Sequence, residues 1–326
     1  MIRTIISSNN EPSFNLAAEE FLLRKRDNDI MFFYINKPSV IIGKHQNALS
    51  EINLPYLESQ NIPLYRRLSG GGTVYHDLGN INFCFIKNGE TGHLVDFKKA
   101  TQPIVNALNK WGIAARNGER NDLLINYKKI SGNACHVFKR RVMHHGTLLY
   151  QSELNKLTAS LKSDPSKFID KAVKSVRSEV MNITEVYNKN LSPKEFMLQL
   201  VSTIEHHETD ANRIDFTPDE ILAIEELATN KYTTPEWNYS YGPAYVFKKR
   251  GKAGKYIFVI KLTVNKGKIT EININSNYPV KQIIEDLRQA VKNKYHTKSA
   301  IEDEIKEHQI DKKYQLPISE LTTLFF

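Results

Sequence analysis

Short β-type hydrophobic runs dominate the first 150 residues, and few helical patterns separate them. Strands are predicted at residues 3–7, 31–36, 39–44, 63–68, 73–76, 82–87, 114–119, 122–126 and 142–150. The runs at 31–36 and 39–44 flank Lys37-Pro38, which favours a hairpin-like pair. Apolar residues at helical spacing predict helices over 15–26, 54–60 and 96–111, and residues 129–134 are expected to form a turn. This order of elements indicates an α+β domain with a mostly antiparallel or mixed sheet rather than regular βαβ winding.

The pattern becomes more helical after residue 150 and changes again near residue 246. Helices are predicted over 164–174, 192–206 and 217–230, the last two from start signals at Ser192-Pro193 and Thr217-Pro218. An aromatic loop follows at residues 233–245. Beyond it, paired strands are predicted at 256–264 and 269–275, and helices at 281–292, 301–308 and 318–325. We therefore expect two domains, residues 1–245 and a small α+β domain at residues 246–326.

The composition is that of an ordinary globular protein. Of the 326 residues, 40% are hydrophobic and 25% charged, and no apolar run approaches the length of a membrane span. The N-terminal residues lack a signal-peptide pattern. Cys84 and Cys135 give neither a disulfide framework nor a metal-ligand spacing. We expect a cytoplasmic protein with reduced thiols and no membrane partner.

The net charge of +9 indicates anionic partners. The basic residues are scattered, however, and do not form the aromatic-interleaved stripe that is typical of nucleic-acid-binding surfaces. An acidic protein or a nucleotide fits this charge as well as nucleic acid does, and a solvated basic surface without a partner is the structural alternative. A non-enzymatic nucleic-acid-binding protein remains the alternative that charge alone supports.

A glycine-rich stretch, RRLSGGGTVYHDLGNIN, runs from Arg66 to Asn82 between predicted strands. Its three glycines let the backbone approach a ligand, and consecutive free N–H groups can bind an anion. Arg66 and Arg67 add planar, bidentate donors. These features suit a phosphate or a carboxylate, and a glycine-rich hairpin with two solvated arginines is the structural alternative. No Lys-Ser/Thr pair and no helix follows the glycines, which excludes a P-loop. The polar residues 43–47 also follow a predicted strand, within reach of a site.

Further candidate residues lie between positions 120 and 150. Lys129 precedes a Ser-Gly pair, where its ammonium can hold a phosphate and a carboxylate together. Asp122 is a candidate Mg²⁺ ligand, with substrate phosphates completing the shell. His144 and His145 face opposite sides of a strand, so both cannot bind one ion. Cys135 is a candidate nucleophile if a base lies nearby. The structural alternatives are a surface lysine, a turn aspartate and a small buried cysteine.

Six motifs occur in order along the large domain: RRLSGGGTVYHDLGN, RNDLLI, KKISGNA, HHGTLL, SVRSEVMNITE and EWNYSYGPAY. With FNLAAEE from Phe14, they resemble the lipoate–protein ligase A family over nearly the whole large domain. The residues after Val246 resemble that family's small C-terminal accessory domain. The resemblance implies the α+β fold shared with biotin protein ligases. It also implies that lipoate and ATP form lipoyl-AMP and pyrophosphate, after which the lipoyl group passes to a lysine of a carrier domain.

The resemblance assigns roles by position. The positions that correspond to nucleotide-binding residues are Arg67, Gly72, Thr73, Val74, Tyr75, Asn121, Asp122 and Lys129. The positions assigned to substrate binding are Arg66, His76, Lys129 and His145. Arg67 and Lys129 are the expected catalytic residues, because with Mg²⁺ they would stabilise charge on the α-phosphate. The apolar lipoyl tail needs a hydrophobic slot, with candidate walls at Val40, Ile41, Ile42 and Val74.

The implied small molecules are lipoate, ATP and Mg²⁺. The implied carriers are the lipoyl domains of 2-oxoacid dehydrogenase acyltransferase subunits and the glycine cleavage H protein, and we expect a monomer. Two related activities stay open: a lipoyltransferase that uses preformed lipoyl-AMP, and an octanoyltransferase or amidotransferase that uses Cys135 without ATP. A biotin ligase is less favoured, because Arg-Arg-Leu-Ser precedes the glycines here, unlike the interleaved Gly-Arg pattern of that family.

Overall fold

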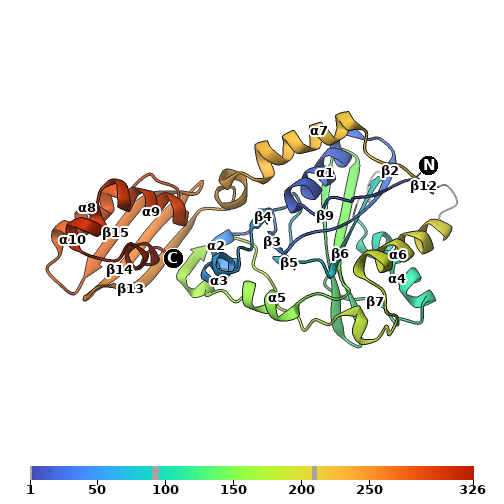
Figure 1. Cartoon of the computed structure of the whole chain (residues 1–326), viewed down its shortest axis with the longest axis horizontal. Helices are drawn as coiled ribbons and strands as arrows, with labels where there is room; N and C mark the ends of the chain where they lie inside the picture. The colour runs from blue at the N-terminus through green and yellow to red at the C-terminus, as the bar shows by residue number, and fades with distance from the viewer. Residues whose placement is uncertain (1, 90–94, 208–210) are drawn as a thin grey trace.

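The computed structural model describes residues 2–89, 95–207 and 211–326. A large N-terminal unit contains most of the chain, and a smaller C-terminal unit projects from one end of it (Figure 1). The strands belong to three sheets with eight, four and three strands. No helix among these residues is long and apolar enough to cross a membrane.

The largest sheet has the strand order β12-β1-β2-β6-β10-β9-β8-β7. Its strands are β1 (Ile2–Ile6), β2 (Asp29–Ile35), β6 (Asn80–Asn88), β7 (Arg116–Asn117), β8 (Asp122–Ile125), β9 (Lys128–Phe138), β10 (Arg141–Leu149) and β12 (Ala211–Arg213). Strand β1 pairs in parallel with β12 and β2, whereas the other neighbours are antiparallel. The predicted α+β class with a mixed sheet is confirmed.

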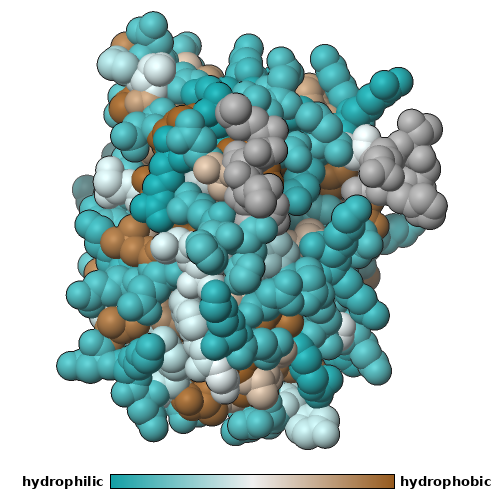
Figure 2. Space-filling view, turned by 90° about the vertical axis from the view of Figure 1, so that its right-hand side faces the viewer, coloured by the Kyte–Doolittle hydropathy of each residue, from teal (hydrophilic) through white to brown (hydrophobic). Residues whose placement is uncertain are grey.

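Helices cover both faces of this sheet because alternate residues of its strands are apolar on both sides. On one face, Phe33 and Phe85 pack with α4 (Phe97–Lys110) and α6 (Pro193–His207). On the other, Phe32 and Cys84 pack with α1 (Pro12–Lys25) and α7 (Pro218–Leu227). Figure 1 shows α1 and α7 on one side of the long strands, with α4 and α6 on the other side. The face seen in Figure 2 is predominantly hydrophilic, with hydrophobic residues scattered over it.

A three-stranded sheet of order β4-β3-β5 lies beside the large one and carries the glycine-rich stretch. Its strands are β3 (Ser39–Ile42), β4 (Leu64–Arg66) and β5 (Val74–His76), and the short helices nearby are α2 (Ala48–Glu51), α3 (Leu54–Ser59) and α5 (Leu154–Ser160). Strand β3 is central, parallel to β4 and antiparallel to β5. The glycine stretch therefore links two outer strands and does not form a hairpin.

The predicted hairpin of residues 31–36 and 39–44 is wrong, although both strands exist. Strand β2 belongs to the large sheet and β3 to the small one. The chain leaves the first sheet at Asn36, whose buried side chain bonds Asn15 and His76, and Pro38 has no N–H to continue a ladder. Side-chain hydrogen bonds to residues 21 and 40 positions away in the sequence thus decide where the strand ends.

Two other local predictions are also wrong. Residues 129–134 lie inside β9, because the turn is at Asn126 and Tyr127, whose φ values of 49° and 63° suit a two-residue hairpin. The helix predicted over 164–174 is replaced by a 3₁₀ turn (Pro165–Lys167) and strand β11 (Phe168–Asp170). Strand β11 pairs with β13 of the C-terminal unit, and this tertiary pairing overrides the local helical pattern.

The C-terminal unit is a second small α+β body. Its sheet has the order β11-β13-β14-β15, with β13 (Tyr245–Ala253), β14 (Tyr256–Asn265) and β15 (Lys268–Ser276). Helices α8 (Lys281–Val291), α9 (Lys298–Glu307), α10 (Ile310–Tyr314) and α11 (Ile318–Thr323) pack on it around a core of its own. Residues 245/246 remain our proposed boundary, close to the start of β13. Across it, Lys298 pairs with Glu58 at 2.7 Å.

Short helical turns complete the chain between these elements. They are η2 (Ile183–Glu185), η3 (Ala228–Tyr232) and η4 (Glu236–Ser240). The expected aromatic loop at residues 233–245 therefore contains a helical turn. Its Trp237 Nε1 donates to Arg66 O at 2.7 Å, which fixes the loop against the three-stranded sheet.

Candidate functional site

Two adjoining cavities lie where the glycine-rich stretch faces the large sheet. The α1 cavity has a volume of about 440 Å³ and reaches Leu16 on α1. The α5 cavity has a volume of about 420 Å³ and reaches Leu157 on α5. Residues shared by both walls are Thr73, Val74, Lys129, Gly132, Thr147, Lys174, Ser175, Val176 and Ser178. Two ligands, or two parts of one ligand, can therefore meet beside Lys129.

The side chain of Arg67 holds the glycine-rich stretch in shape. Its Nη2 donates to Gly70 O at 2.6 Å and Gly72 O at 2.7 Å, while Nε donates to the hydroxyl of Ser69 at 2.9 Å. Burial lowers the pKa of Arg67 to about 10, so the guanidinium stays charged at neutral pH. The stretch is wrapped around a fixed positive charge that lines the α1 cavity.

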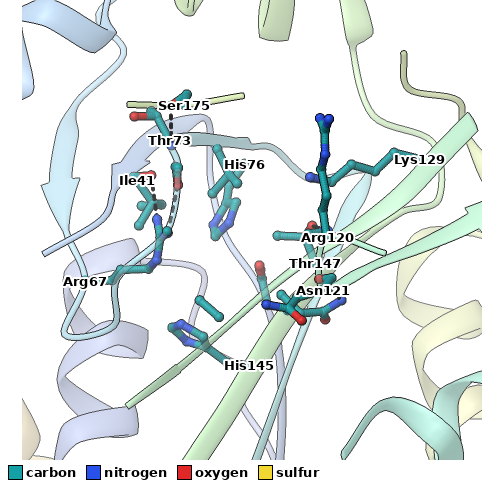
Figure 3. A pocket seen from close by; sticks show the side chains of 18 of the residues that line it. Ile41, Arg67, Thr73, His76, Arg120, Asn121, Lys129, His145, Thr147 and Ser175 are labelled. Carbon is teal, nitrogen blue, oxygen red and sulfur yellow. Dashed lines mark hydrogen bonds between the residues drawn. The ribbon is translucent and has the colours of Figure 1, made fainter. Parts of the chain in front are cut away.

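Lys129 approaches from the opposite wall, on β9 (Figure 3). Burial lowers its pKa, Asp122 raises it, and Arg67 and Arg120 lower it further. A Cβ at Gly132 would lie 3.3 Å from both Cε and Nζ of Lys129, so glycine leaves space for the lysine beside the strand. The ammonium of Lys129 is thus brought to the junction of the two cavities.

His145 and His144 face opposite sides of β10, as predicted. His145 lines the α1 cavity, and its Nε2 lies 2.6 Å from the Ser69 hydroxyl. Its Nδ1 lies 2.7 Å from Oε2 of the buried Glu19, whose other oxygen, Oε1, accepts from the Tyr34 hydroxyl at 3.0 Å. His144 instead packs edge-on against Phe97. The His145 network connects α1 to the glycine-rich stretch.

His76 presents a neutral ring to the α1 cavity. Its pKa is lowered to about 3 by burial, with smaller contributions from Arg67 and His145. Asn36 Nδ2 donates to Nδ1 at 3.0 Å, which assigns the proton of the neutral ring to Nε2. That Nε2 is buried without a partner among the described residues. His76 can therefore donate one hydrogen bond to a ligand.

The structure places Arg66 away from both cavities. Its side chain is 0% exposed, and its five hydrogen bonds go to main-chain carbonyls. The acceptors are the carbonyls of Gly43, Lys44, Gln46, Trp237 and Asn238. Arg66 fixes two loops to each other, and sequence alone does not separate this role from that of Arg67.

The apolar walls divide according to the strand alternation. Ile41 and Val74 line the α1 cavity, whereas Val40 and Ile42 point into a separate core beneath the three-stranded sheet. Tyr75 borders the α5 cavity, and burial raises the pKa of its phenol. Two of the four residues predicted as walls of the slot thus face the α1 cavity.

Asn121 and Asp122 separate in the structure. Asn121 lines the α1 cavity, and its carbonyl accepts from Asn133 N at 3.1 Å. Asp122 lines neither cavity, and its Oδ1 accepts from Arg120 N at 3.3 Å. No cluster of three or more potential metal ligands occurs among the described residues. The described side chains therefore do not form a protein-built Mg²⁺ site.

Cys135 also lies outside the two cavities, as far as the described residues define them. The preceding residue, Ala134, lines the α1 cavity, so strand alternation directs the Cys135 side chain to the opposite face. Burial raises the pKa of the thiol. Its position and protonation state give no support to a thioester mechanism.

Several functional positions were not assigned by sequence analysis. The roof segment, which we define as residues 173–178, lies over both cavities. Its Ser175 accepts a hydrogen bond from Thr73 N at 2.9 Å (Figure 3). The polar stretch 43–47 reaches the site through Gln46, and Thr147 and Arg120 complete the walls. The SVRSEVMNITE motif overlaps the roof segment, but it did not indicate which of its residues would have a function.

The arrangement can hold two anionic groups close together. Lys129 stands at the junction of the two cavities, while Arg67 and the amides of the glycine-rich stretch bring positive charge and hydrogen-bond donors to the adjoining wall of the α1 cavity. Such a junction can place a carboxylate beside a phosphate and offset their repulsion. The apolar parts of the two ligands then occupy separate cavities.

Comparisons with known families agree over most of the chain. Residues 11–205 match the lipoyl protein ligase A/B catalytic domain, and residues 243–325 match the bacterial lipoate protein ligase C-terminus. Lipoate–protein ligase 1 of Staphylococcus aureus is 39% identical, with 94% of each chain covered. Lipoate-protein ligase LplJ of Bacillus subtilis is 34% identical, with 90% of each chain covered.

Solved structures are similar in fold as well. Plasmodium falciparum LipL1 in complex with lipoate matches with a TM-score of 0.63 and 25% identity, over 97% of this chain and 98% of that one. A lipoate-protein ligase A bound with ATP matches with a TM-score of 0.62 and 29% identity, over 73% and 98%. A bipartite Thermoplasma acidophilum lipoate protein ligase, described with its E2 lipoyl domain, matches with a TM-score of 0.62 and 30% identity, over 73% and 95%.

Proposed function

The chain belongs to the lipoate–protein ligase family, and we propose that its two adjoining cavities are the site where lipoate meets ATP. The enzyme activates lipoate with ATP to lipoyl-AMP and transfers the lipoyl group to a lysine of a carrier domain. The observation that carries the residue assignment is the junction at Lys129 and Thr73, which both cavities share.

In the activation step, a carboxylate oxygen of lipoate attacks the α-phosphorus of ATP, and the bond to pyrophosphate breaks. Lys129 sits between the two anions and offsets their repulsion. Arg67 acts with it by fixing the carbonyls of Gly70 and Gly72, which shapes the glycine-rich stretch around the developing charge. Both groups are prepositioned before substrates bind, so little reorganisation is needed at the moment of reaction.

The cavities differ in what they can recognise. We assign the lipoyl chain to the α1 cavity, where Leu16, Ile41 and Val74 give apolar walls and His76 offers a hydrogen bond. We assign the nucleoside to the α5 cavity, which is bordered by β5. Strand β5 lies at the edge of its sheet within the described chain, so its outer main-chain groups are available to hydrogen-bond a base.

Mg²⁺ is proposed to arrive with the ATP phosphates. The donor set of the described residues does not form a cage, and Asp122 faces the main chain at Arg120. Mg²⁺ is commonly bound through substrate phosphates with few protein ligands, and this donor set fits that mode. The ion would supply charge neutralisation on the phosphates.

In the transfer step, the neutral amine of the carrier lysine attacks the carbonyl carbon of lipoyl-AMP. The bond to AMP breaks, the amine loses a proton, and AMP leaves. We propose as carriers the lipoyl domains of 2-oxoacid dehydrogenase acyltransferase subunits and the glycine cleavage H protein, supported by the E2 lipoyl domain described with the Thermoplasma ligase. We further propose a monomer that acts in the cytoplasm, where ATP is supplied.

The intact mass of an acidic lipoyl domain tests this function. One incubation holds enzyme, lipoate, ATP and Mg²⁺, and a second holds enzyme and preformed lipoyl-AMP. We expect the mass of one lipoyl group to be added in both. Modification with lipoyl-AMP alone would reduce the enzyme to a lipoyltransferase, and no modification in either incubation would overturn the function.

A further inference from the structure

Among the described residues, the hydroxyl of Ser175 provides the hydrogen bond that attaches the roof segment to the glycine-rich stretch. The oxygen accepts from Thr73 N at 2.9 Å and from Gln46 Nε2 at 3.1 Å, and it donates to a carboxylate oxygen of Glu51. A serine hydroxyl has one donor and two acceptor positions, and all three are used. This contact ties the roof to the strand and loop that shape the phosphate site.

Close packing accompanies the hydrogen bonds. A Cβ at Gly72 would lie 3.1 Å from Oγ and 3.3 Å from Cα of Ser175, so the two main chains approach each other directly. The side chain of Gln46 is fully buried, and its Oε1 accepts from Thr73 Oγ1 at 2.9 Å and Gly43 N at 2.8 Å. Gln46 and Ser175 thus hold Thr73 from both its side chain and its amide.

Glu51 has a buried acidic side chain that takes no part in the activation and transfer steps described above. It is 7% exposed, and the described residues provide it with no ion pair, only the hydroxyl and the amide of Ser175. Burying a carboxylate without a cation is unfavourable, and a charge-assisted hydrogen bond is its main compensation. The position is therefore suited to holding Ser175 and poorly suited to stabilising the fold.

The roof is also held at other points, because Val173 N donates to His45 O at 3.2 Å and Arg177 Nη2 donates to Leu161 O at 3.4 Å. Asp170 pairs with Lys174 at 2.8 Å on one side, and Lys129 N donates to Glu179 O at 2.8 Å on the other. Between these points the roof is open to solvent, with Val176 65% exposed. A bond in the middle of the segment decides how closely it covers the junction of the two cavities.

Resting on the proposed function, we propose that Glu51 is a positioning residue for the ligase reaction. Through Ser175 it holds the roof segment against Thr73, and this keeps lipoyl-AMP from leaving or hydrolysing before a carrier lysine arrives. Glu51 borders the α5 cavity, and we assign it an effect on the roof through Ser175. Loss of Glu51 uncouples the two steps. AMP is still released, but a smaller share of that release is accompanied by lipoylation of a carrier lysine.

The test compares AMP released with carrier modified, by nucleotide chromatography and intact mass, in the full-length enzyme. The variants are Glu51→Ala, Ser175→Ala, Glu51→Gln and the double variant Glu51→Ala with Ser175→Ala. Ser166→Ala, an exposed serine ahead of β11, is the matched control. We expect AMP per modified carrier to rise about tenfold in each alanine variant, the size expected for one charge-assisted hydrogen bond.

The double variant should be no worse than either single variant, because both remove the same bond. Glu51→Gln should recover part of the coupling, since its amide oxygen still accepts from Ser175. A ratio unchanged in Ser175→Ala, or additive effects in the double variant, would overturn the inference even if Glu51→Ala folds poorly. Failure of the wild type to form AMP and modified carrier would instead overturn the proposed function.

Discussion

Nζ of Lys129 lies beside Gly132, where a side-chain carbon would stand only 3.3 Å away. This contact is tighter than ordinary packing, so an alanine would shift the end of the Lys129 side chain by a few tenths of an ångström. For Gly132→Ala we expect lipoate-dependent pyrophosphate release to fall by up to about tenfold, because catalysis is sensitive to the position of a catalytic group.

The melting temperature of Gly132→Ala should stay close to that of the wild type, because the change adds one methyl group beside a flexible side chain. In the double variant Lys129→Ala with Gly132→Ala, pyrophosphate release should be little lower than in Lys129→Ala alone. Full activity in Gly132→Ala would mean that the position of Lys129 is not critical.

The two adjacent arginines should give different phenotypes. Arg66→Ala leaves buried carbonyls of two loops without a donor, which predicts a loss of about 2–4 kcal/mol in the free energy of unfolding. The folded fraction should keep a nearly normal KM for ATP. Urea unfolding and initial rates check both points, and a raised KM with unchanged stability would return Arg66 to the binding site.

Because lipoate and ATP are assigned to different cavities, one substitution in each cavity should affect the KM of one substrate and not that of the other. Ile41→Trp fills the α1 cavity and should raise the KM for lipoate by at least about tenfold, with little change for ATP. Leu157→Trp fills the α5 cavity and should do the reverse. Steady-state kinetics with each substrate varied in turn make the comparison. An exchange of the two phenotypes would reverse the assignment of lipoyl chain and nucleoside.

Buried histidines make stability depend on pH. The pKa of His76 is lowered to about 3 and that of His296 to about 4, both mainly by burial. Below the unfolded-state pKa of about 6.5, the unfolded chain binds more protons than the folded one, so stability falls as the pH decreases. By about pH 5 the loss should be about 1–2 kcal/mol per histidine.

Urea unfolding near neutral pH and near pH 5 measures this effect. His296→Gln should be less stable at both pH values but should show a smaller difference between them. His296 lies in the C-terminal unit, away from the two cavities, so activity is a separate readout. Stability that is equal at the two pH values would contradict the burial of these rings as neutral groups.

Local patterns predicted most elements well because those signals lie in neighbouring residues. Asp96 accepts from Lys99 N at the start of α4, and Thr217 forms a capping box with Glu220 at the start of α7. Two of the three errors occurred where distant contacts decide, whereas the turn expected at residues 129–134 was displaced by a local turn at Asn126 and Tyr127. Strand β11 pairs with β13 across the sequence, and Asn36 ends β2 through bonds to Asn15 and His76.

The site shows the same division. Motif resemblance placed Arg67, Lys129 and the glycine-rich stretch in one site, and these residues do meet at the cavities. It could not separate Arg66, the last residue of β4, from Arg67, which follows it, because only the tertiary structure shows what each side chain meets. Glu51 and Ser175 are 124 positions apart, so the sequence around either residue did not predict their contact.

The central claim is that Lys129 joins the lipoate carboxylate to the α-phosphate of ATP. The most direct measurement is lipoate-dependent pyrophosphate release by Lys129→Ala, with circular dichroism and a melting curve to establish that the variant is folded. We predict that release is abolished while the melting temperature changes little, because the lysine supplies charge and not core packing. Normal pyrophosphate release from the folded variant would contradict the account.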